Sequence, residues 1–183
     1  MKQLDFSTFP VLETDRLILR RLSLEDAPVI YQLRSDVEVA ALTGKAPFIH
    51  IDEAIAYINK IDHLINNDES IYWVASYKGD NAMIGAACLW NFDLRNETVE
   101  LGYELLPEFQ GKGIMVEIIT RILQYAFEVM GIKTIVACPS SDNPPSVKLL
   151  EKMGFEIASS DYQNTHVNVP GMLTFILTGY PKQ

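Results

Sequence analysis

The segment from Thr98 to Met130 constrains the fold more than any other part of the sequence, because a strand, a glycine-rich turn and a long helix follow one another in it. Residues 98–106 are predicted to form a strand, which Pro107 ends. The turn at residues 110–113 leads into a helix over roughly residues 113–130, with isoleucine and leucine side chains on one broad face. Such a face needs a buried partner, so we expect this helix to pack on a sheet.

Patterns on both sides of this segment complete the expected fold. Residues 16–20 alternate as a first strand, and Ser23 with Asp26 forms a variant capping box before a helix over residues 27–34. Helices interrupt a series of strands, which predicts one domain, residues 1–183, of the α/β (mixed α+β) class. Its mixed, mostly antiparallel sheet of about six to seven strands has helices on both faces. Further strands are expected at 71–77, 83–90, 133–138, 155–160 and 173–177, and further helices at 52–65 and 143–153.

The charge and the cysteine content of the chain limit its partners. Its 183 residues have a formal net charge of −9, which opposes binding to nucleic acid because phosphate is bound by clustered Lys and Arg. No apolar run approaches the ~18 residues that suggest a membrane span. Cys88 and Cys138 lie inside apolar runs, and the N-terminal residues lack a secretory layout. We expect a cytoplasmic protein with neither a nucleic-acid nor a membrane partner.

The turn before the long helix is a candidate phosphate site. The first N–H groups of a helix are unpaired and carry partial positive charge, so they can hold a diphosphate. Gly111 and Gly113 let the backbone approach a ligand closely, and Lys112 adds a local cation. A Gly-Lys-Gly turn alone is more often a solvated loop. Its spacing fits neither a nucleotide P-loop nor a dinucleotide fingerprint.

Two segments together resemble the GNAT acetyltransferase superfamily, in a branch similar to ribosomal-protein alanine N-acetyltransferases. The sequence Pro107-Glu-Phe-Gln-Gly-Lys-Gly113 resembles the acetyl-coenzyme A loop Q/R-x-x-G-x-G/A, with Met115 where Gly or Ala is usual. The sequence Asn143-Pro-Pro-Ser146-Val-Lys-Leu-Leu-Glu-Lys-Met-Gly-Phe155 resembles the signature N-x-x-S/A followed by E-K-x-G-F. Asn143 is also a good helix N-cap, with Pro144 at the first helical position.

The resemblance implies acetyl-CoA as cosubstrate, no metal, and a splayed sheet whose opened strand edge pairs with the pantetheine arm. It further implies that the N–H near Leu105 binds the thioester carbonyl and then the oxyanion, a contribution of about 3–4 kcal/mol. The residues that it assigns to the coenzyme are Tyr103, Leu105, Gln110, Gly111, Lys112, Gly113, Ile114, Met115, Asn143, Ser146 and Lys152.

Two residues are candidates for catalysis. Many GNAT enzymes have a Tyr general acid where this chain has Leu150, so Ser146 becomes the candidate that hydrogen-bonds the coenzyme sulfur; the alternative is that it only caps its helix. Glu100 lies where several family members place a catalytic base, and alternation puts Glu104 on the same face. Both can equally be exposed strand carboxylates. His166 is a further candidate base.

The remaining reactive and aromatic side chains have plainer interpretations. Cys138 lacks a basic partner in the sequence that would activate it, so a buried strand cysteine is expected. Trp73, Trp90 and Phe92 are interpreted as core or pocket wall, with core favoured.

These residues predict an N-acetyltransferase that acts on a primary amine by direct attack in a ternary complex. The acceptor is expected to be a protein N-terminus or a small-molecule amine, and the protein a monomer or homodimer. Specificity is assigned to residues 36–51, expected to be irregular because of Gly44 and Pro47, and to residues 161–171. Asp36, Glu38 and Asp161 could attract a cationic acceptor. A non-catalytic acetyl-CoA-binding module and a structural protein that shares the fold are the alternatives.

Overall fold

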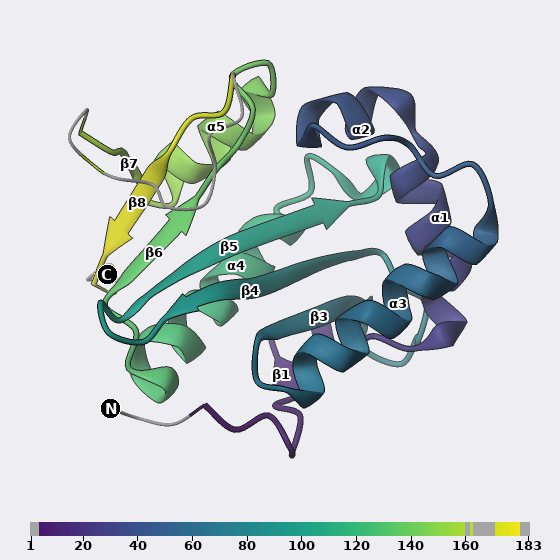
Figure 1. Ribbon diagram of the computed structural model, residues 1–183, viewed down its shortest axis with the longest axis horizontal. Coiled ribbons are helices and arrows are strands. Elements are labelled where there is room, and N and C mark those ends of the chain that lie inside the picture. Colours follow the sequence, from purple (N-terminus) through teal and green to yellow (C-terminus); the bar gives the residue numbers. More distant parts are fainter. Residues whose placement is uncertain (1–3, 160–161, 163–170, 180–183) are drawn as a thin grey trace.

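One eight-stranded sheet, in the order β1-β2-β3-β4-β5-β6-β8-β7, organises the protein. The structure is a computed structural model that describes residues 4–159, 162 and 171–179. Figure 1 shows α3 in front of the sheet and α4 behind it, so helices cover both faces as predicted. The strands are β1 (Leu12–Glu13), β2 (Leu17–Arg21), β3 (Ser70–Tyr77), β4 (Gly85–Asp93), β5 (Thr98–Leu105), β6 (Thr134–Ala137), β7 (Glu156–Ile157) and β8 (Phe175–Thr178). The α-helices are α1 (Ala27–Ser35), α2 (Val37–Thr43), α3 (Ile51–Asn66), α4 (Ile114–Gln124) and α5 (Pro144–Lys152).

The strands β5 and β6 form the one parallel pair among the described strands, and they soon part. Their register joins Thr98 to Thr134, Val99 to Ile135 and Glu100 to Val136, whereas β5 continues to Leu105. Figure 1 shows the two strands diverging beyond their shared end. The splayed, mostly antiparallel sheet that the sequence predicted is therefore confirmed, and Glu100 stands where the strands separate.

The expectation that residues 36–51 are irregular is wrong in part, because they contain α2. The Asp36 carboxylate caps this helix by accepting the N–H groups of Glu38, at 2.8 Å, and Val39, at 3.2 Å. Gly44 ends it with a left-handed φ of 66°. The sheet also has one strand more than the six to seven expected, because β1 is a two-residue strand recognisable only by its pairing. The strand expected at residues 155–160 is present as β7 but is only two residues long.

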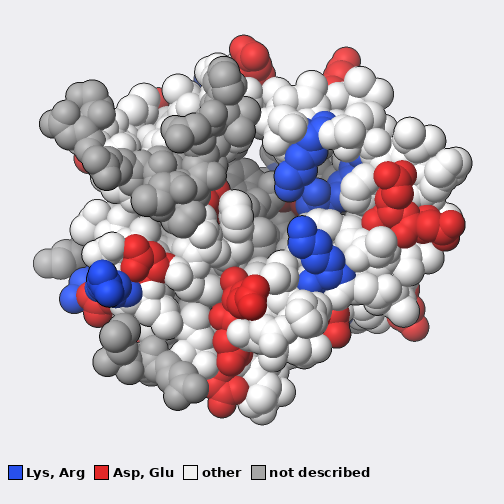
Figure 2. Space-filling model, viewed as in Figure 1, with Lys and Arg blue, Asp and Glu red and all other residues white. Residues whose placement is uncertain are grey.

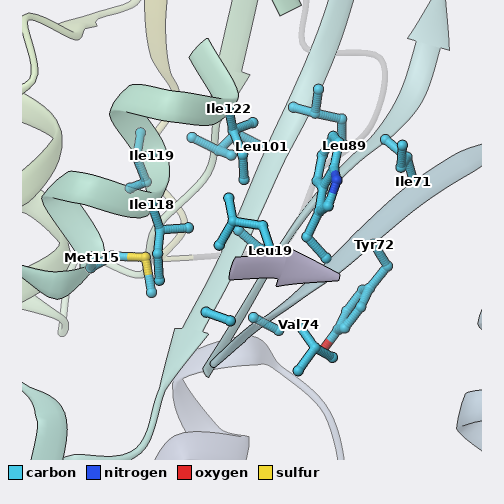
Figure 3. Packing of buried hydrophobic residues seen from close by; sticks show 14 of the residues in the cluster. Leu19, Ile71, Tyr72, Val74, Leu89, Leu101, Met115, Ile118, Ile119 and Ile122 are labelled. Atoms are coloured by element: carbon cyan, nitrogen blue, oxygen red, sulfur yellow. The ribbon is translucent and has the colours of Figure 1, made fainter. Parts of the chain in front are cut away.

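The core lies on both faces of the sheet, with α4 packed on one face and α1 and α3 on the other. Ile118, Ile119 and Ile122 are fully buried, and Figure 3 shows them pointing toward Leu19 and Leu101. The long helix ends in a π-helical turn, Tyr125–Met130, within the range predicted for one helix. Within the described ranges, no helix combines the length and the apolar character that crossing a bilayer requires.

The predicted capping box is confirmed at the start of the helical layer. The Asp26 carboxylate accepts the Ser23 N–H at 2.9 Å and also pairs with Arg20 at 2.7 Å. Asp26 is only 3% exposed, and the two partners satisfy its charge. The turn after β2 is thereby fixed, which sets the position of α1 over the sheet.

Candidate active site

The glycine turn leads directly into α4. Gly111 and Gly113 have φ values of +72° and +73°, the left-handed region in which glycine avoids the strain that a Cβ causes. Gly113 is the N-cap residue, and the N–H of Glu117 donates to its carbonyl at 3.1 Å. The N–H groups just before Glu117 have no partner within the helix. This turn thus has the backbone that the predicted diphosphate site requires.

Met115 and Ile114 have their side chains in the core. They are 8% and 1% exposed, and Figure 3 shows Met115 pointing toward the sheet beside Ile118. The large side chain that replaces the usual Gly or Ala therefore stays clear of the turn. Any contact that these two residues make with a coenzyme comes from their backbone.

A second set of contacts ties the turn to β2. The Arg16 guanidinium pairs with Glu117 at 2.6 Å and also donates to the Lys112 carbonyl at 3.4 Å. Thr14 donates to the same Glu117 carboxylate at 2.5 Å. The Lys112 ammonium lies 5.6 Å from the ring centre of Phe109. Arg16 and Lys112 thus place two cations at the start of α4.

The end of β5 presents backbone groups toward the diverging edge. The Leu106 N–H donates to the Ile84 carbonyl at 3.0 Å, so strand alternation turns the groups of Leu105 to the opposite edge. The Gln110 side chain donates to the Leu105 carbonyl at 3.1 Å. The Leu105 N–H therefore lies on the side that the resemblance assigned to the thioester, and Gln110 holds the strand end in place.

Glu100 is a buried carboxyl. Strand alternation places its side chain on the same face of the sheet as that of Glu104, and the residue is 6% exposed. Asn91, at a bulge of β4 with a φ of +61°, donates to Glu100 Oε2 at 3.3 Å. Burial raises the pKa of Glu100, and the Asn91 hydrogen bond and the positive charge of Lys45 oppose this. A raised pKa brings a carboxyl closer to the working range of a general base.

Ser146 and Tyr103 meet across the diverging strands. Tyr103 Oη and Ser146 Oγ lie 2.6 Å apart. Asn143 Oδ1 accepts the Ser146 N–H at 3.2 Å, so Asn143 caps α5 as predicted and the Ser146 hydroxyl is not the cap. Burial raises the pKa of Tyr103, against the effect of Ser146, and its phenol stays protonated. Tyr103, Asn143 and Ser146 are thus together.

Two other α5 residues take no part in that contact. Leu150, in place of the usual tyrosine, is fully buried, and Lys152 is an exposed residue at the last turn of the helix. A helix of nine residues is about 13 Å long. Lys152 is therefore not part of the group formed by Tyr103, Asn143 and Ser146.

Glu104 belongs to a network that the sequence did not indicate. Tyr72 donates to its carboxylate at 2.5 Å and Arg34 pairs with it at 3.2 Å. Arg34 also donates to the Tyr57 hydroxyl at 2.9 Å, with its guanidinium 4.0 Å from that ring centre. Burial raises the pKa of Tyr72 well above its usual value, so Tyr72 remains a proton donor. Glu104 is an internal ion-pair partner rather than an exposed strand carboxylate.

The other candidates divide between core and surface. Trp73 is fully buried as favoured, but Trp90, the cross-strand neighbour of Glu100, is 40% exposed and is not a core residue. Burial raises the pKa of the Cys88 thiol to about 12, which excludes it as a nucleophile. His166 and most of residues 161–171 lie outside the described residues. Within the described part of the chain, no cluster of His, Cys, Asp and Glu could hold a metal ion.

Comparison with known proteins identifies the class that this fold and site define. The family described as acetyltransferase (GNAT) domain matches residues 16–156. The chain therefore belongs to the GNAT acetyltransferase family, and it is an acetyl-CoA-dependent acyltransferase.

One sequence relative and two solved structures each match most of the chain. An uncharacterized N-acetyltransferase, YoaA of Bacillus subtilis, is 34% identical over 148 residues, which are 81% of this chain and 84% of the relative. The crystal structure of spermidine N-acetyltransferase from Vibrio cholerae in complex with CoA and spermine has a TM-score of 0.73 at 24% identity, over 88% of this chain and 95% of that one. The ribosomal-protein-S5-alanine acetyltransferase from Vibrio fischeri has a TM-score of 0.73 at 20% identity, over 93% and 97% of the two chains.

Proposed function

We propose that the protein acetylates a primary amine, either a small molecule or a protein N-terminus, by direct attack within a ternary complex. The observation that carries this proposal is the position of Glu100, a buried carboxyl with a raised pKa at the point where β5 and β6 separate. A base there adjoins the strand edge along which the pantetheine arm is proposed to lie.

The coenzyme is proposed to be held by the turn before α4 and by the first turn of α5. Gly111, Lys112 and Gly113 offer backbone N–H groups to the diphosphate, aided by the field of the helix. The Gln110 N–H donates to the Pro107 carbonyl at 3.1 Å, so Gln110 is proposed to support the turn instead. Ile114 and Met115 add only backbone groups, since their side chains are buried. Tyr103, Leu105, Asn143 and Ser146 surround the proposed thioester end. Lys152, at the far end of α5, stays a prediction.

The chemistry follows from where these groups lie. Acetyl-CoA supplies a thioester whose C–S bond breaks as the new C–N bond forms. Glu100 accepts the proton that the amine loses, directly or through a water molecule. The Leu105 N–H stabilises the developing charge on the carbonyl oxygen. Ser146 donates a hydrogen bond to the departing sulfur, and Tyr103 donates in turn to Ser146.

The need for a base depends on the acceptor. An α-amine with a pKa near 8 is roughly one-tenth neutral at pH 7, whereas a lysine amine near 10.4 is under about one in a thousand neutral. A buried carboxyl such as Glu100 is therefore most important for a strongly basic amine.

Two sequence features favour the alternative of a non-catalytic coenzyme-binding module, namely Met115 in the coenzyme loop and Leu150 in place of the usual tyrosine. The structure places the Met115 side chain in the core, and Tyr103 brings a phenol to α5 from β5 instead.

Release of free thiol from acetyl-CoA, measured with N-terminal peptides, polyamines, amino acids and aminoglycosides, tests the proposal. We expect amine-dependent release with at least one group and an acetylated product by mass spectrometry. Tight coenzyme binding without release across the whole panel would favour the non-catalytic module.

A further inference from the structure

A small hollow lies on the Glu104 face of the sheet, between α1, the end of α2 and β5. Its cavity volume is about 30 Å³, so it has room for one small group of a ligand, such as a carboxylate, rather than for a whole molecule. Leu33, Val39 and Phe48 supply apolar wall, whereas Arg34, Lys45 and Glu104 supply charge. Figure 2 shows basic side chains gathered at the surface near α1 and α2.

The negative charge in the hollow is already neutralised. Glu104 accepts from Tyr72 at 2.5 Å and pairs with Arg34 at 3.2 Å, and both charged side chains are 17% exposed. The Nε of Arg34 is buried without a hydrogen-bond partner among the described residues. A cationic ligand would have to compete with Arg34 for this carboxylate.

The positive charge of Lys45 is not neutralised. No ion pair or side-chain hydrogen bond joins Lys45 to another described residue, and the residue is exposed at the rim of the hollow. Partial desolvation of its ammonium group beside the hollow lowers the pKa of Lys45, and the positive charges of Arg34 and Lys60 lower it further, against the opposing effect of Glu104. An anion bound here would gain a charge-assisted hydrogen bond and relieve this repulsion.

Lys45 also acts electrostatically on the proposed base. Its charge acts on the pKa of Glu100 and favours the ionised carboxylate. An acceptor whose amine reaches Glu100 can therefore place a second group of the same small molecule near Lys45.

We propose that the acceptor is a small amine that carries a carboxylate, with Lys45 binding the carboxylate and the apolar wall at Leu33 and Phe48 contacting the rest of the molecule. This assignment rests on the proposed acetylation of a primary amine. The proposed acceptor differs from the spermine bound in the structural neighbour. A polyamine has no carboxylate that could bind Lys45, and its positive charges are repelled by the Lys45 ammonium.

The experiment compares each of the twenty amino acids with its own carboxamide, and both with spermidine, in acetyl-CoA thiol release. The carboxamide is the stringent control because its α-amine is less basic and is more often neutral at a given pH. Without a contact to the carboxylate, the carboxamide should therefore react faster than the amino acid. We expect the best amino acid to exceed its carboxamide by about tenfold or more in kcat/KM, the worth of one hydrogen bond to a charged group.

Variants of Lys45 test the binding role. In Lys45→Gln the KM for the best amino acid should rise about tenfold, its kcat should change less, and its preference over the carboxamide should disappear. Lys45→Arg should restore the preference. Lys133→Gln is the matched control, since Lys133 is an exposed lysine that pairs with Glu97 beside the start of β6, away from the hollow.

The outcomes separate this inference from the proposed function. Acetylation of carboxamides or spermidine as efficiently as of amino acids, or a preference unchanged in Lys45→Gln, would overturn the carboxylate assignment and leave the N-acetyltransferase intact. Failure to acetylate any amine, including the peptides and aminoglycosides, would overturn the proposed function and this inference with it.

Discussion

Tyr103 Oη lies 2.6 Å from Ser146 Oγ, so one hydrogen bond connects β5 to the first turn of α5 where the sheet opens. If Ser146 stabilises the departing sulfur, Ser146→Ala should lower kcat about tenfold to a hundredfold, as expected for a hydrogen bond to a charged group. Coenzyme affinity should change little. Tyr103→Phe should produce a smaller loss in the same parameter.

The control for this prediction is Asn143→Ala. It removes the cap of α5 and should lower the free energy of unfolding by about 1 kcal/mol. A Ser146→Ala variant that loses stability like Asn143→Ala, yet turns over normally, would assign the serine to structure alone. Steady-state kinetics and urea unfolding of the three variants distinguish the roles.

Glu100 should determine the acid side of the pH profile. As a base it works ionised, so activity should fall as the pH drops through its raised pKa, above the ordinary range of a glutamate. Glu100→Gln should reduce kcat/KM by about 10² to 10⁴ and remove this fall. The profile is measured as kcat/KM for one amine between about pH 5 and 9, in steps of about half a pH unit.

Asn91→Gly offers a finer test of the same group. Glycine retains the positive φ at the bulge, but the hydrogen bond that lowers the pKa of Glu100 is lost. The acid side of the profile should therefore move to higher pH. A profile that stays in place would mean that Glu100 does not titrate in the reaction.

Gly111 and Gly79 form a matched pair for the coenzyme turn. Both have a positive φ, and an added Cβ meets no protein atom within 4 Å at either position. Alanine should cost each about 1 kcal/mol of stability through backbone strain. Only Gly111→Ala should also weaken coenzyme binding, by about tenfold for one lost hydrogen bond. Calorimetric titration with coenzyme A would contradict the diphosphate site if the two variants bound equally well.

The Arg34–Glu104 ion pair should contribute to the free energy of unfolding. Glu104→Gln leaves the largely buried Arg34 without its counter-ion, and we expect a loss of about 3 kcal/mol in the free energy of unfolding. Glu97→Gln breaks the exposed pair with Lys133 and should cost less than about 1 kcal/mol. Similar losses in the two variants, measured by urea unfolding, would show that the network around Glu104 contributes no more than a surface pair.

The parts of the fold that local patterns determine were predictable from the sequence. The strand before Pro107, the glycine turn and the start of α4 depend on residues close together in the chain, and so does the Asn143 cap. The seven-residue α2 was missed because it buries only Ala40 and so has almost no periodic signal.

The candidate site was predictable only where motifs marked it. Tyr103 and Ser146 both came from the family resemblance, but their contact spans 43 residues of sequence. Arg34 and Tyr72 reach Glu104 from α1 and β3, and Tyr57 of α3 accepts a hydrogen bond from Arg34. No local sequence pattern relates these residues. The sequence contains only a weak indication of the bulge at Asn91, because asparagine tolerates the left-handed conformation that this bulge requires.

The short ladder between β5 and β6 has a consequence for folding. The strands β1 to β5 each pair with their neighbour along the chain, whereas α4 separates β5 from β6 in the sequence. Glu100 is opposite Val136 in the last pair of the β5–β6 ladder. Because burial raises the pKa of Glu100, we expect this shift only in the assembled sheet, and an unfolded chain should carry an ordinary glutamate there.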